Sequence, residues 1–503
     1  MRRLGLDKST SCCACSPVPN LMPKLFRHRA AVALLSSGRP RRIGWSLIAS
    51  ATLAIAACGG GGSDGFFSPL PAVPAAPPPP APTYTVGGSV TGLIGTGLVL
   101  QNNAGDDLAI AANGSFSFGA ALPSGANYAV TVKSQSKILT RVCTISNGAG
   151  TVADAAVTNV AVTCAAPAAR FAYAANDFGN SLSGYTIDAK TGAFSPMAIP
   201  TVAMAITPTF ITVDPSGRFV YVAHTGANNV SGYTIDASTG ALSPMAVLTV
   251  STGKLPTSIA VDPTGRFAYV ANGDDNNVSA YNIDARTGAL SPMTTPTVAT
   301  GNSPFSIAVD PTGRFAYVAN SGDNNVSAYT IDAKTGALSP MATPTVASGD
   351  YPAFITVDPT GRFAYVTNWA SDNVSGYTID AITGALIPMA KPTVPAGSLP
   401  TSISVDPTGR FAYVTNYVSD NVSTYTIDAR TGALSPMATP TFTAGGNPGY
   451  VTVDPTGRVA YVMNGGTRDV SACTIDASTG VLSLMATLPV AAGTLNQSLV
   501  LSR

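Results

Sequence analysis

The sequence predicts an all-β protein in which a small β-sandwich precedes a seven-bladed β-propeller. The composition is one reason: the chain is rich in Val, Thr, Ala, Gly, Asn and Pro and has no Glu, so residues that favour strands and turns dominate. The other reason is a repeat of fixed length. Arg170 and Arg218, which are 48 residues apart, both stand before a strand-like aromatic sequence. A period of this size is typical of repeat architectures.

The length and charge of the chain exclude several classes of protein. With 503 residues, it is too long for one ordinary compact core but has room for a large repeat domain with additions. Charged residues make up 11% of the chain and the formal net charge is +1, so no basic field is present to bind nucleic acid. We expect a monomer with neither a metal nor a cofactor.

Residues 1–57 have the pattern of an N-terminal extension followed by an export signal. The basic segment "RPRR" precedes an apolar stretch from Ile43 to Ala57, which is shorter than a membrane span. This stretch leads into "IAAC", which resembles the lipobox of bacterial lipoproteins and implies lipid attachment at Cys58. The alternative is an ordinary signal peptide with a chance cysteine. The resemblance, with Gly59 rather than Asp after the cysteine, implies a bacterial cell-envelope protein anchored to the outer membrane.

Residues 58–83 are predicted to be a tether between this anchor and the folded part. The sequence "CGGGGSDG" is typical of a flexible linker, and "PLPAVPAAPPPPAPT" is typical of an extended, semi-rigid spacer. We expect the tether to hold the folded part away from a membrane surface.

Residues 84–165 alternate apolar and polar side chains in the manner of strands, and two Asn-Gly pairs supply hairpin turns. About eighty residues give a marginal core, so a covalent link is valuable. We expect Cys143 and Cys164 to form a disulfide between neighbouring strands, worth about 3 kcal/mol by loop-closure estimates. The domain is interpreted as a small immunoglobulin-like sandwich that serves as a spacer.

Residues 166–503 contain seven copies of the repeat, and a complete copy has four strand-like runs, which is the pattern of propeller blades. "VDPTG" predicts a type I turn between the first two strands, and "IDAKTGAL" predicts the hairpin between the last two. Proline in "SPM" cannot donate to a ladder, so the last strand is expected at the outer edge. The first copy lacks its first strand, and Ser498 to Ser502 stands in the register of that strand. The C-terminal strand is therefore predicted to complete the first blade and close the ring.

The direction of the strands sorts the loops onto two faces. Both uniform turns, "VDPTG" and "IDAxTGAL", fall on one end of the blades, which we call the turn face. The loops between second and third strands and between blades share the other end, and they differ among the copies, as in "NGDDNN", "NWASDN" and "NGGTRD". We call this end the variable face and expect a binding surface there.

The strand sequence "FAYVTN" at Phe363 and Phe411, with "VSGYTIDAITGAL" downstream, resembles YVTN-repeat propellers and propeller-type lactonases, including bacterial 6-phosphogluconolactonase. The resemblance covers Arg170 to Arg503 and implies the propeller fold. It also implies lactone hydrolysis by His, Glu and Arg residues around the central channel. This chain departs from that pattern, because it has no Glu and only His224 in the propeller.

The candidate functional residues are those that break the repeat on the variable face. His224 replaces an Asn found in the six other copies, and it is interpreted either as a general acid or base or as a hydrogen-bonding substitute for Asn. Arg468 is a non-repeated cation that could stabilise an oxyanion. Trp369 and Tyr417 occupy matching positions in adjacent blades and could form an aromatic platform for a sugar or peptide. The remaining candidates for ligand binding are Asp177, Asp274, Asp275, Asp323 and Tyr351.

Three functions remain open from these observations. The favoured hypothesis is an exported, lipid-anchored propeller that binds a sugar, lactone or peptide on its variable face without catalysis. The second is a lactone hydrolase acting at the mouth of the central channel through His224 and Arg468. The third is a structural envelope protein whose ring only presents surface.

Overall fold

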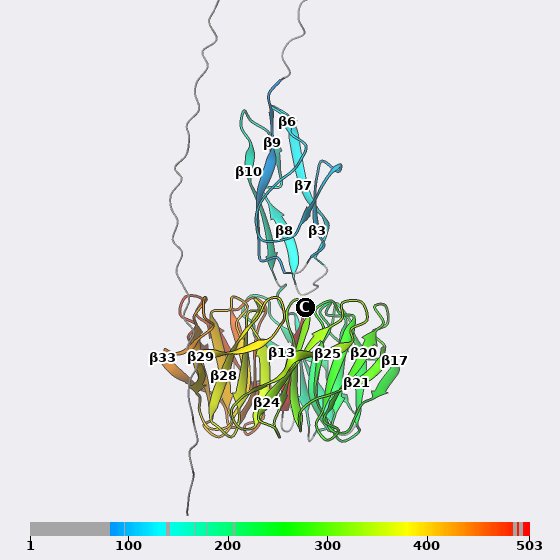
Figure 1. The fold of residues 1–503 in the computed structure, drawn as a ribbon, viewed down its shortest axis with the longest axis vertical. Helices are drawn as coiled ribbons and strands as arrows, with labels where there is room; N and C mark the ends of the chain where they lie inside the picture. Colours follow the sequence, from blue (N-terminus) through cyan, green and yellow to red (C-terminus); the bar gives the residue numbers. More distant parts are fainter. Residues whose placement is uncertain are drawn as a thin grey trace, which may run out of the picture. The chain divides into compact units, whose positions relative to one another are not determined.

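The computed structural model describes residues 81–503 except 95, 137–140, 166, 178, 205–206, 486–489 and 492–495. Every regular element in this part of the chain is a β-strand, as Figure 1 shows. The same residues contain no helix long and apolar enough to span a membrane. The predicted extension and signal, Cys58 and residues 59–80 of the tether lie outside the described residues.

The first strands build two four-stranded sheets that share one hydrophobic core, which includes Val86, Leu98, Leu100 and Val160. A short pair, β1 (Thr83–Tyr84) and β6 (Leu122–Pro123), accompanies them. In order across each sheet, the strands are β5 (Gly114–Ser117), β2 (Val86–Thr91), β10 (Val157–Ala165) and β8 (Val142–Ser146), and β4 (Asp106–Ile110), β3 (Leu98–Asn102), β7 (Asn127–Ser134) and β9 (Ala149–Thr151). The immunoglobulin-like assignment and the domain boundaries stay predictions.

The expected disulfide is confirmed. Cys143 on β8 and Cys164 on β10 are direct partners in the antiparallel ladder, and their sulfur atoms are bonded. Both side chains are buried in the core. The bond therefore links adjacent strands of one sheet, where it closes a chain segment of 21 residues.

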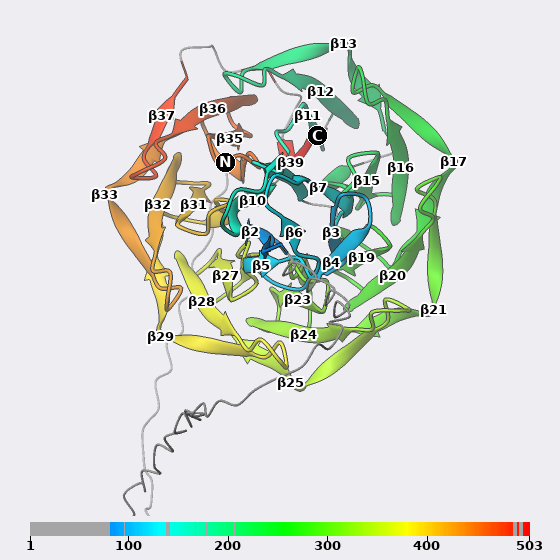
Figure 2. The ribbon, with the colours of Figure 1, turned by 90° about the horizontal axis from the view of Figure 1, so that it is seen from above.

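The repeats form seven separate sheets around a common axis, as Figure 2 shows, and the predicted propeller is confirmed. From the inner to the outer strand, blades 1 to 4 consist of β39 (Asn496–Ser502), β11 (Phe171–Asn176), β12 (Ser181–Ile187) and β13 (Phe194–Ala203); β14 (Pro208–Val213), β15 (Phe219–His224), β16 (Asn229–Ile235) and β17 (Leu242–Ser251); β18 (Pro256–Val261), β19 (Phe267–Asn272), β20 (Asn277–Ile283) and β21 (Leu290–Ala299); and β22 (Pro304–Val309), β23 (Phe315–Asn320), β24 (Asn325–Ile331) and β25 (Leu338–Ala347).

Blades 5 to 7 repeat the pattern, and the strand that contains the "SPM" proline is the outer strand of its blade, as expected. These blades consist of β26 (Pro352–Val357), β27 (Phe363–Asn368), β28 (Asn373–Ile379) and β29 (Leu386–Pro395); β30 (Pro400–Val405), β31 (Phe411–Asn416), β32 (Asn421–Ile427) and β33 (Leu434–Thr443); and β34 (Pro448–Val453), β35 (Val459–Asn464), β36 (Asp469–Ile475) and β37 (Leu482–Leu484), with β38 (Val490–Ala491) also paired to β36.

The ring is closed by the C-terminal strand. β39 pairs with β11 so that Ser498 lies opposite Ala175, which is the register that Ser306 and Ala319 have in blade 4. The Ser498 hydroxyl accepts a hydrogen bond from the Ile211 backbone N–H at 3.0 Å, and this bond joins the end of the chain to blade 2. This pairing covers the edge of β11, which would otherwise be an unpaired strand edge in blade 1.

The second strand of every blade is buried over its whole length, because a neighbouring sheet covers each of its faces. Its tyrosine is fully buried and donates a hydrogen bond to a glycine carbonyl in the "TGAL" turn of the next blade. In the middle of the chain, Tyr317 reaches the Gly384 oxygen at 2.7 Å. We call these seven bonds the tyrosine latches; the tyrosines are Tyr173, Tyr221, Tyr269, Tyr317, Tyr365, Tyr413 and Tyr461.

Only glycine fits at the position whose carbonyl accepts the latch hydrogen bond. Gly384 has a φ of 75°, and a Cβ added there would lie 2.3 Å from a ring carbon of Phe315 in the preceding blade. Close packing and left-handed backbone therefore both require glycine. The last latch, Tyr461 to Gly192, joins blade 7 to blade 1 across 269 residues of sequence.

Arginine side chains confirm that the two uniform turns share one face. The guanidinium of Arg218, at the end of one "VDPTG"-type turn, donates to the Ala285 carbonyl in the "IDAxTG" turn of the next blade at 2.7 Å. Asp214 in the first turn accepts the backbone N–H of Arg218 and of Phe219. In the second uniform turn, Asp236 accepts the backbone N–H of Thr239 at 2.8 Å, so aspartates cap both types of turn.

Deletion of residues 496–503 is expected to lower the melting temperature by many degrees and to cause aggregation. The deletion removes the inner strand of blade 1 and exposes the edge of β11. Thermal melting followed by circular dichroism, with size-exclusion chromatography, measures both effects. An unchanged melting curve would contradict the closure described above.

The stability of the protein is expected to fall as the pH rises above about 10. Burial raises the pKa of Tyr377 and Tyr425 to about 12, and it also raises the pKa of the seven latch tyrosines. Above pH 10 the unfolded chain loses phenolic protons that the folded chain keeps, so unfolding is favoured through the window from about pH 10 to 12. Melting curves between pH 8 and 12 test this fall. Phenolate absorbance should appear together with unfolding, and tyrosines that ionise near pH 10 in the folded state would contradict it.

Candidate functional site: an aromatic cup on the variable face

A cavity of about 450 Å³ opens at the variable-face end of the central channel. Its lining comes from the inner strands and the variable loops of several blades. Seven aromatic side chains dominate the lining, and we call the cavity the aromatic cup. These side chains are Phe210, Phe305, Tyr351, Phe354, Trp369, Tyr417 and Tyr450. A cavity of this size is in the range of small-molecule sites.

Three rings from three different blades form the floor of the cup. Phe210, Phe354 and Tyr450 stand at the same position of their inner strands, and their ring centroids are 5.7 to 6.4 Å apart. The other four blades have serine at this position, namely Ser258, Ser306, Ser402 and Ser498. The serines leave space along the axis, and the three large rings meet in it.

The wall of the cup is formed by side chains that the variable loops leave half exposed. Tyr351 and Trp369 lie with their ring centroids 5.3 Å apart, and Phe305 lies 6.4 Å from Tyr351 on its other side. Their exposed fractions are 43% for Phe305, 42% for Tyr351 and 37% for Trp369. Large apolar side chains that gather and stay exposed are a common sign of a binding site.

Tyr351 is held in the cup by an unusual backbone conformation. Its φ is 55°, in the left-handed region that non-glycine residues rarely adopt. Its N–H donates to the Asn324 side-chain oxygen of the preceding blade at 2.8 Å, and its carbonyl accepts the Trp369 N–H at 2.9 Å. Leu255, which also lines the cup, has the same arrangement with Asn228. These bonds offset the backbone strain and aim both side chains at the cup.

Several polar side chains of the lining already have partners within the protein. The Thr257 hydroxyl donates to the Pro304 carbonyl at 2.9 Å, and the Asn447 amide donates to the Tyr417 carbonyl at 3.0 Å. The Ser306 hydroxyl accepts the Ile355 N–H at 3.3 Å. Burial raises the pKa of Tyr450 to about 12, so its phenol is neutral at physiological pH. The described residues that line the cup include no Asp, His, Lys or Arg.

The aromatic residues that the sequence singled out come together in this site. Tyr351, Trp369 and Tyr417 all line the cup, although they come from separate loops. Their role in ligand binding stays a prediction.

The four candidate aspartates lie away from the cup lining. Asp275 accepts the Lys254 backbone N–H at 2.9 Å, and Asp323 accepts the Asn302 backbone N–H at 2.8 Å, so both carboxylates connect neighbouring loops. Asp274 is exposed and Asp177 is half-buried on the same face. Among the described residues, no group of three or more acidic, His or Cys side chains is placed to hold a metal ion.

His224 lies at the end of β15, where it is fully buried, and it does not line the cup. Its Nε2 is 2.6 Å from the Ser231 hydroxyl. In blade 3, the Asn272 amide donates to the Ser279 hydroxyl at 2.8 Å, which is the equivalent contact. This geometry favours the interpretation of His224 as a substitute for Asn over a role as acid or base. Arg468 is exposed and has a φ of 60° in its turn, outside the cup lining.

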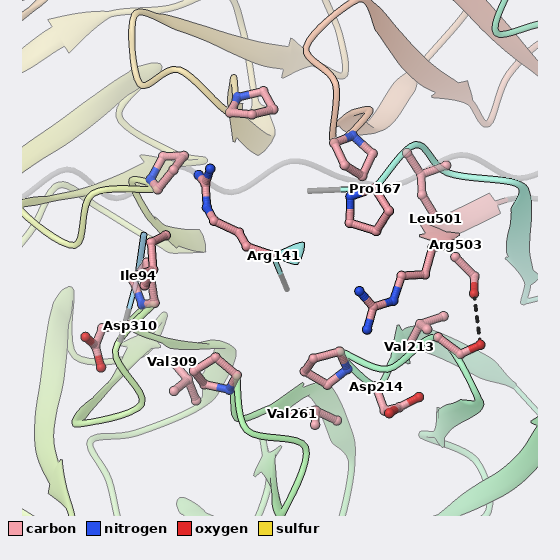
Figure 3. Close-up of a pocket in the computed structure, with 18 of the residues that line it drawn as sticks. Ile94, Arg141, Pro167, Val213, Asp214, Val261, Val309, Asp310, Leu501 and Arg503 are labelled. Atoms are coloured by element: carbon pink, nitrogen blue, oxygen red, sulfur yellow. Dashed lines mark hydrogen bonds between the residues drawn. The ribbon is translucent and has the colours of Figure 1, made fainter. Parts of the chain in front are cut away.

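A second cavity, of about 480 Å³, lies at the turn-face end of the channel. Figure 3 shows it, with Val213, Val261 and Val309 among the side chains around it. The prolines of the seven repeats also line it, and they are Pro167, Pro215, Pro263, Pro311, Pro359, Pro407 and Pro455. Its carboxylates, such as that of Asp214, are already engaged in turn capping. The two cavities share no lining residue.

The floor residues were missed in the sequence, although a signal for them exists. "TFITVD", "AFITVD" and "GYVTVD" place Phe210, Phe354 and Tyr450 where the other copies have serine. Comparison of the inner strands, position by position, would have found them. Phe305 was missed because its position is variable and carries no pattern of its own.

Comparison with known proteins identifies the family. The family model "Lactonase, 7-bladed beta-propeller" matches residues 129–249, 163–304, 292–401 and 390–501, which together cover more than half of the chain. This protein therefore belongs to the lactonase family of seven-bladed β-propellers. No curated protein matches the sequence.

Solved structures with the same fold come from several bacteria. A candidate 6-phosphogluconolactonase of Bacteroides uniformis is 17% identical, with a TM-score of 0.59, and the match covers 67% of this chain and all of that chain. A second candidate 6-phosphogluconolactonase, from Bacteroides fragilis, is 19% identical, with a TM-score of 0.58, and covers 66% of this chain and 98% of its own. The periplasmic gluconolactonase of Pseudomonas aeruginosa is 20% identical, with a TM-score of 0.57, over 67% and 99% of the two chains. At these identities the likeness establishes the fold.

Replacement of Asn324 by Gly is expected to disturb the wall of the cup. The φ of Asn324 is 53°, which Gly adopts freely, so the change removes mainly the side-chain contacts, chief among them the acceptor for the Tyr351 N–H. We expect a loss of about 0.5–1.5 kcal/mol of unfolding free energy and a shift in Trp369 emission. A chain with Trp45→Phe makes Trp369 the only tryptophan for this measurement.

Asn276→Gly is the matched control, because Asn276 has the same φ and supports Ser303, which does not line the cup. This variant should lose similar stability while the emission of Trp369 stays unchanged. Equal emission shifts in both variants would show that Asn324 has no special relation to the cup.

Proposed function

We propose that this protein binds a lactone in the aromatic cup and hydrolyses it. The observation that carries the proposal is the cup itself: a concave, aromatic-lined cavity at the mouth of the channel in a member of the lactonase propeller family. Relatives of the same fold include a periplasmic gluconolactonase and candidate 6-phosphogluconolactonases, which favours hydrolysis over the purely binding role that the sequence suggested first.

Hydrolysis of a cyclic ester requires a water molecule that attacks the carbonyl carbon and donors that stabilise the resulting oxyanion. The phenols of Tyr351 and Tyr417 and the indole N–H of Trp369 are the donors that the cup contributes. The aromatic rings fix the orientation of a flat ring ligand against the wall. Since the described residues of the lining include no Asp, His, Lys or Arg, the base is either solvent water or a side chain of the variable-face loops outside the cup.

A second candidate function is ligand binding without turnover. The observation that favours it is the same lack of Asp, His, Lys and Arg among the described lining residues, because general acid–base catalysis usually depends on such groups. Hydrolysis and binding are separated by measuring them independently on one protein.

We further propose that the protein works in the bacterial cell envelope, where lipid attachment at Cys58 anchors it to the outer membrane. The "IAAC" sequence and the proline-rich tether support this proposal. Radiolabelled palmitate incorporation that is lost in Cys58→Ala would support the anchor, and cleavage at another residue would overturn it.

Turnover of a lactone panel tests the enzymatic proposal. We expect hydrolysis of at least one neutral lactone in a pH-stat assay, and a decrease of at least about tenfold in kcat/KM for Trp369→Ala, because the ring that orients the ligand is lost. His224→Asn is expected to keep most of the activity, since Asn makes the equivalent bond to serine in the other blades.

Loss of turnover in His224→Asn with an unchanged melting temperature would indicate that His224 acts as a general acid or base. The absence of turnover across the panel, with ligand binding retained, would establish the non-catalytic function instead.

A further inference from the structure

The lining of the cup has a chemical character that restricts its ligand. Four side chains of the cup, Leu255, Phe305, Tyr351 and Trp369, are among the large hydrophobic side chains that the described part of the protein leaves exposed. Their concentration around one opening gives a ligand several apolar surfaces to cover at once. Burial of such surface favours binding.

The floor of the cup adds a further apolar surface, in which the Phe210 and Phe354 rings are tilted by 32° to each other and the Tyr450 ring stands edge-on to both. Phe210 and Phe354 have no polar atoms in their rings, and the Tyr450 phenol is neutral. A ligand that reaches the floor loses its hydration without gaining a charged partner. An anionic substituent there would carry a large desolvation cost.

The hydrogen bonds of the lining disfavour a polyhydroxylated ligand as well. Thr257, Ser306 and Asn447 use their side chains for contacts within the protein, as described above. A sugar needs several free donors and acceptors to replace its bonds to water. The groups that remain in the wall are few, and they are the phenols and the indole of the aromatic residues.

We propose that the cup selects an uncharged ligand with a flat, largely apolar ring, such as a lactone fused to an aromatic ring, over phosphorylated or polyhydroxylated sugar lactones. The juxtaposition of the three-ring floor with the Tyr351–Trp369 wall carries this inference. The lactone group of the ligand rests on the proposed function. The apolar ring rests on the lining of the cup alone, so an experiment can contradict one part and support the other.

Binding is measured on the whole chain carrying Trp45→Phe, so that Trp369 is the only fluorescent tryptophan. The probes are dihydrocoumarin, which is a neutral aromatic lactone; chroman, which has the same shape but no ester; glucono-δ-lactone; and 6-phosphogluconolactone. We expect the first two to quench Trp369 with similar affinity and to bind at least about tenfold more tightly than either sugar lactone. Equal or tighter binding of a sugar lactone would overturn the inference, as would a failure of chroman to bind.

Phe354→Ser provides the structural test, because serine occupies the equivalent position in four other blades and fits the fold. The variant opens the floor, so chroman affinity should fall at least about tenfold. Ile382→Ser is the matched control: Ile382 is 82% exposed in a turn on the opposite face, and this change should leave chroman affinity unaltered. Equal effects of the two substitutions would place the binding site elsewhere.

The outcomes separate the inference from the proposed function. Chroman binding without hydrolysis of any lactone supports the cup specificity and overturns the enzymatic proposal. Hydrolysis of 6-phosphogluconolactone without chroman binding supports lactonase activity and overturns the specificity proposed here.

Discussion

The hydrogen bond from a buried tyrosine to a glycine carbonyl of the next blade is the contact on which the architecture depends. It recurs seven times, at 2.6 to 2.7 Å, and each copy crosses the apolar interface between two neighbouring sheets. The tyrosine must be long enough to cross the interface, and the glycine must lack a Cβ for the sheets to approach. The spacing of the blades, and so the width of the channel, follows from these two requirements.

This uniform frame explains how a few substitutions can build a site. The inner strands keep the same backbone in every blade, so an exchange of serine for a large ring changes the channel without changing the fold. Phe210, Phe354 and Tyr450 are such exchanges, and they come from blades that are not neighbours in the ring. The wall differs, because there the loops carry left-handed residues such as Tyr351 that the neighbouring blade holds in place.

The sequence predicted the propeller, the outer position of the proline strands and the closing strand, because each follows from a rule applied to a repeated unit. Cys473 lies buried where other blades have tyrosine, and burial raises its pKa to about 12. Tyr351, Trp369 and Tyr417 were found as candidates because they interrupt a repeat on one face.

The parts of the site that could not be predicted depend on distances across the ring. The floor needs three residues separated by 144 and 96 positions in the chain to meet on the axis, and periodicity alone does not say which side chains reach it. His224 was singled out as the one break in a column of asparagines. Its burial, and its contact with Ser231, depend on packing that the column does not reveal.

The C-terminal strand, β39, also determines when the ring can close. β39 lies at the very end of the chain, yet it is the inner strand of blade 1, and its Ser498 supports blade 2. A nascent chain can stack its middle blades, but the ring stays open until β39 has been synthesised. A product that lacks the residues of β39 keeps an unpaired strand edge at β11. Cellular proteases and chaperones can recognise such an exposed edge.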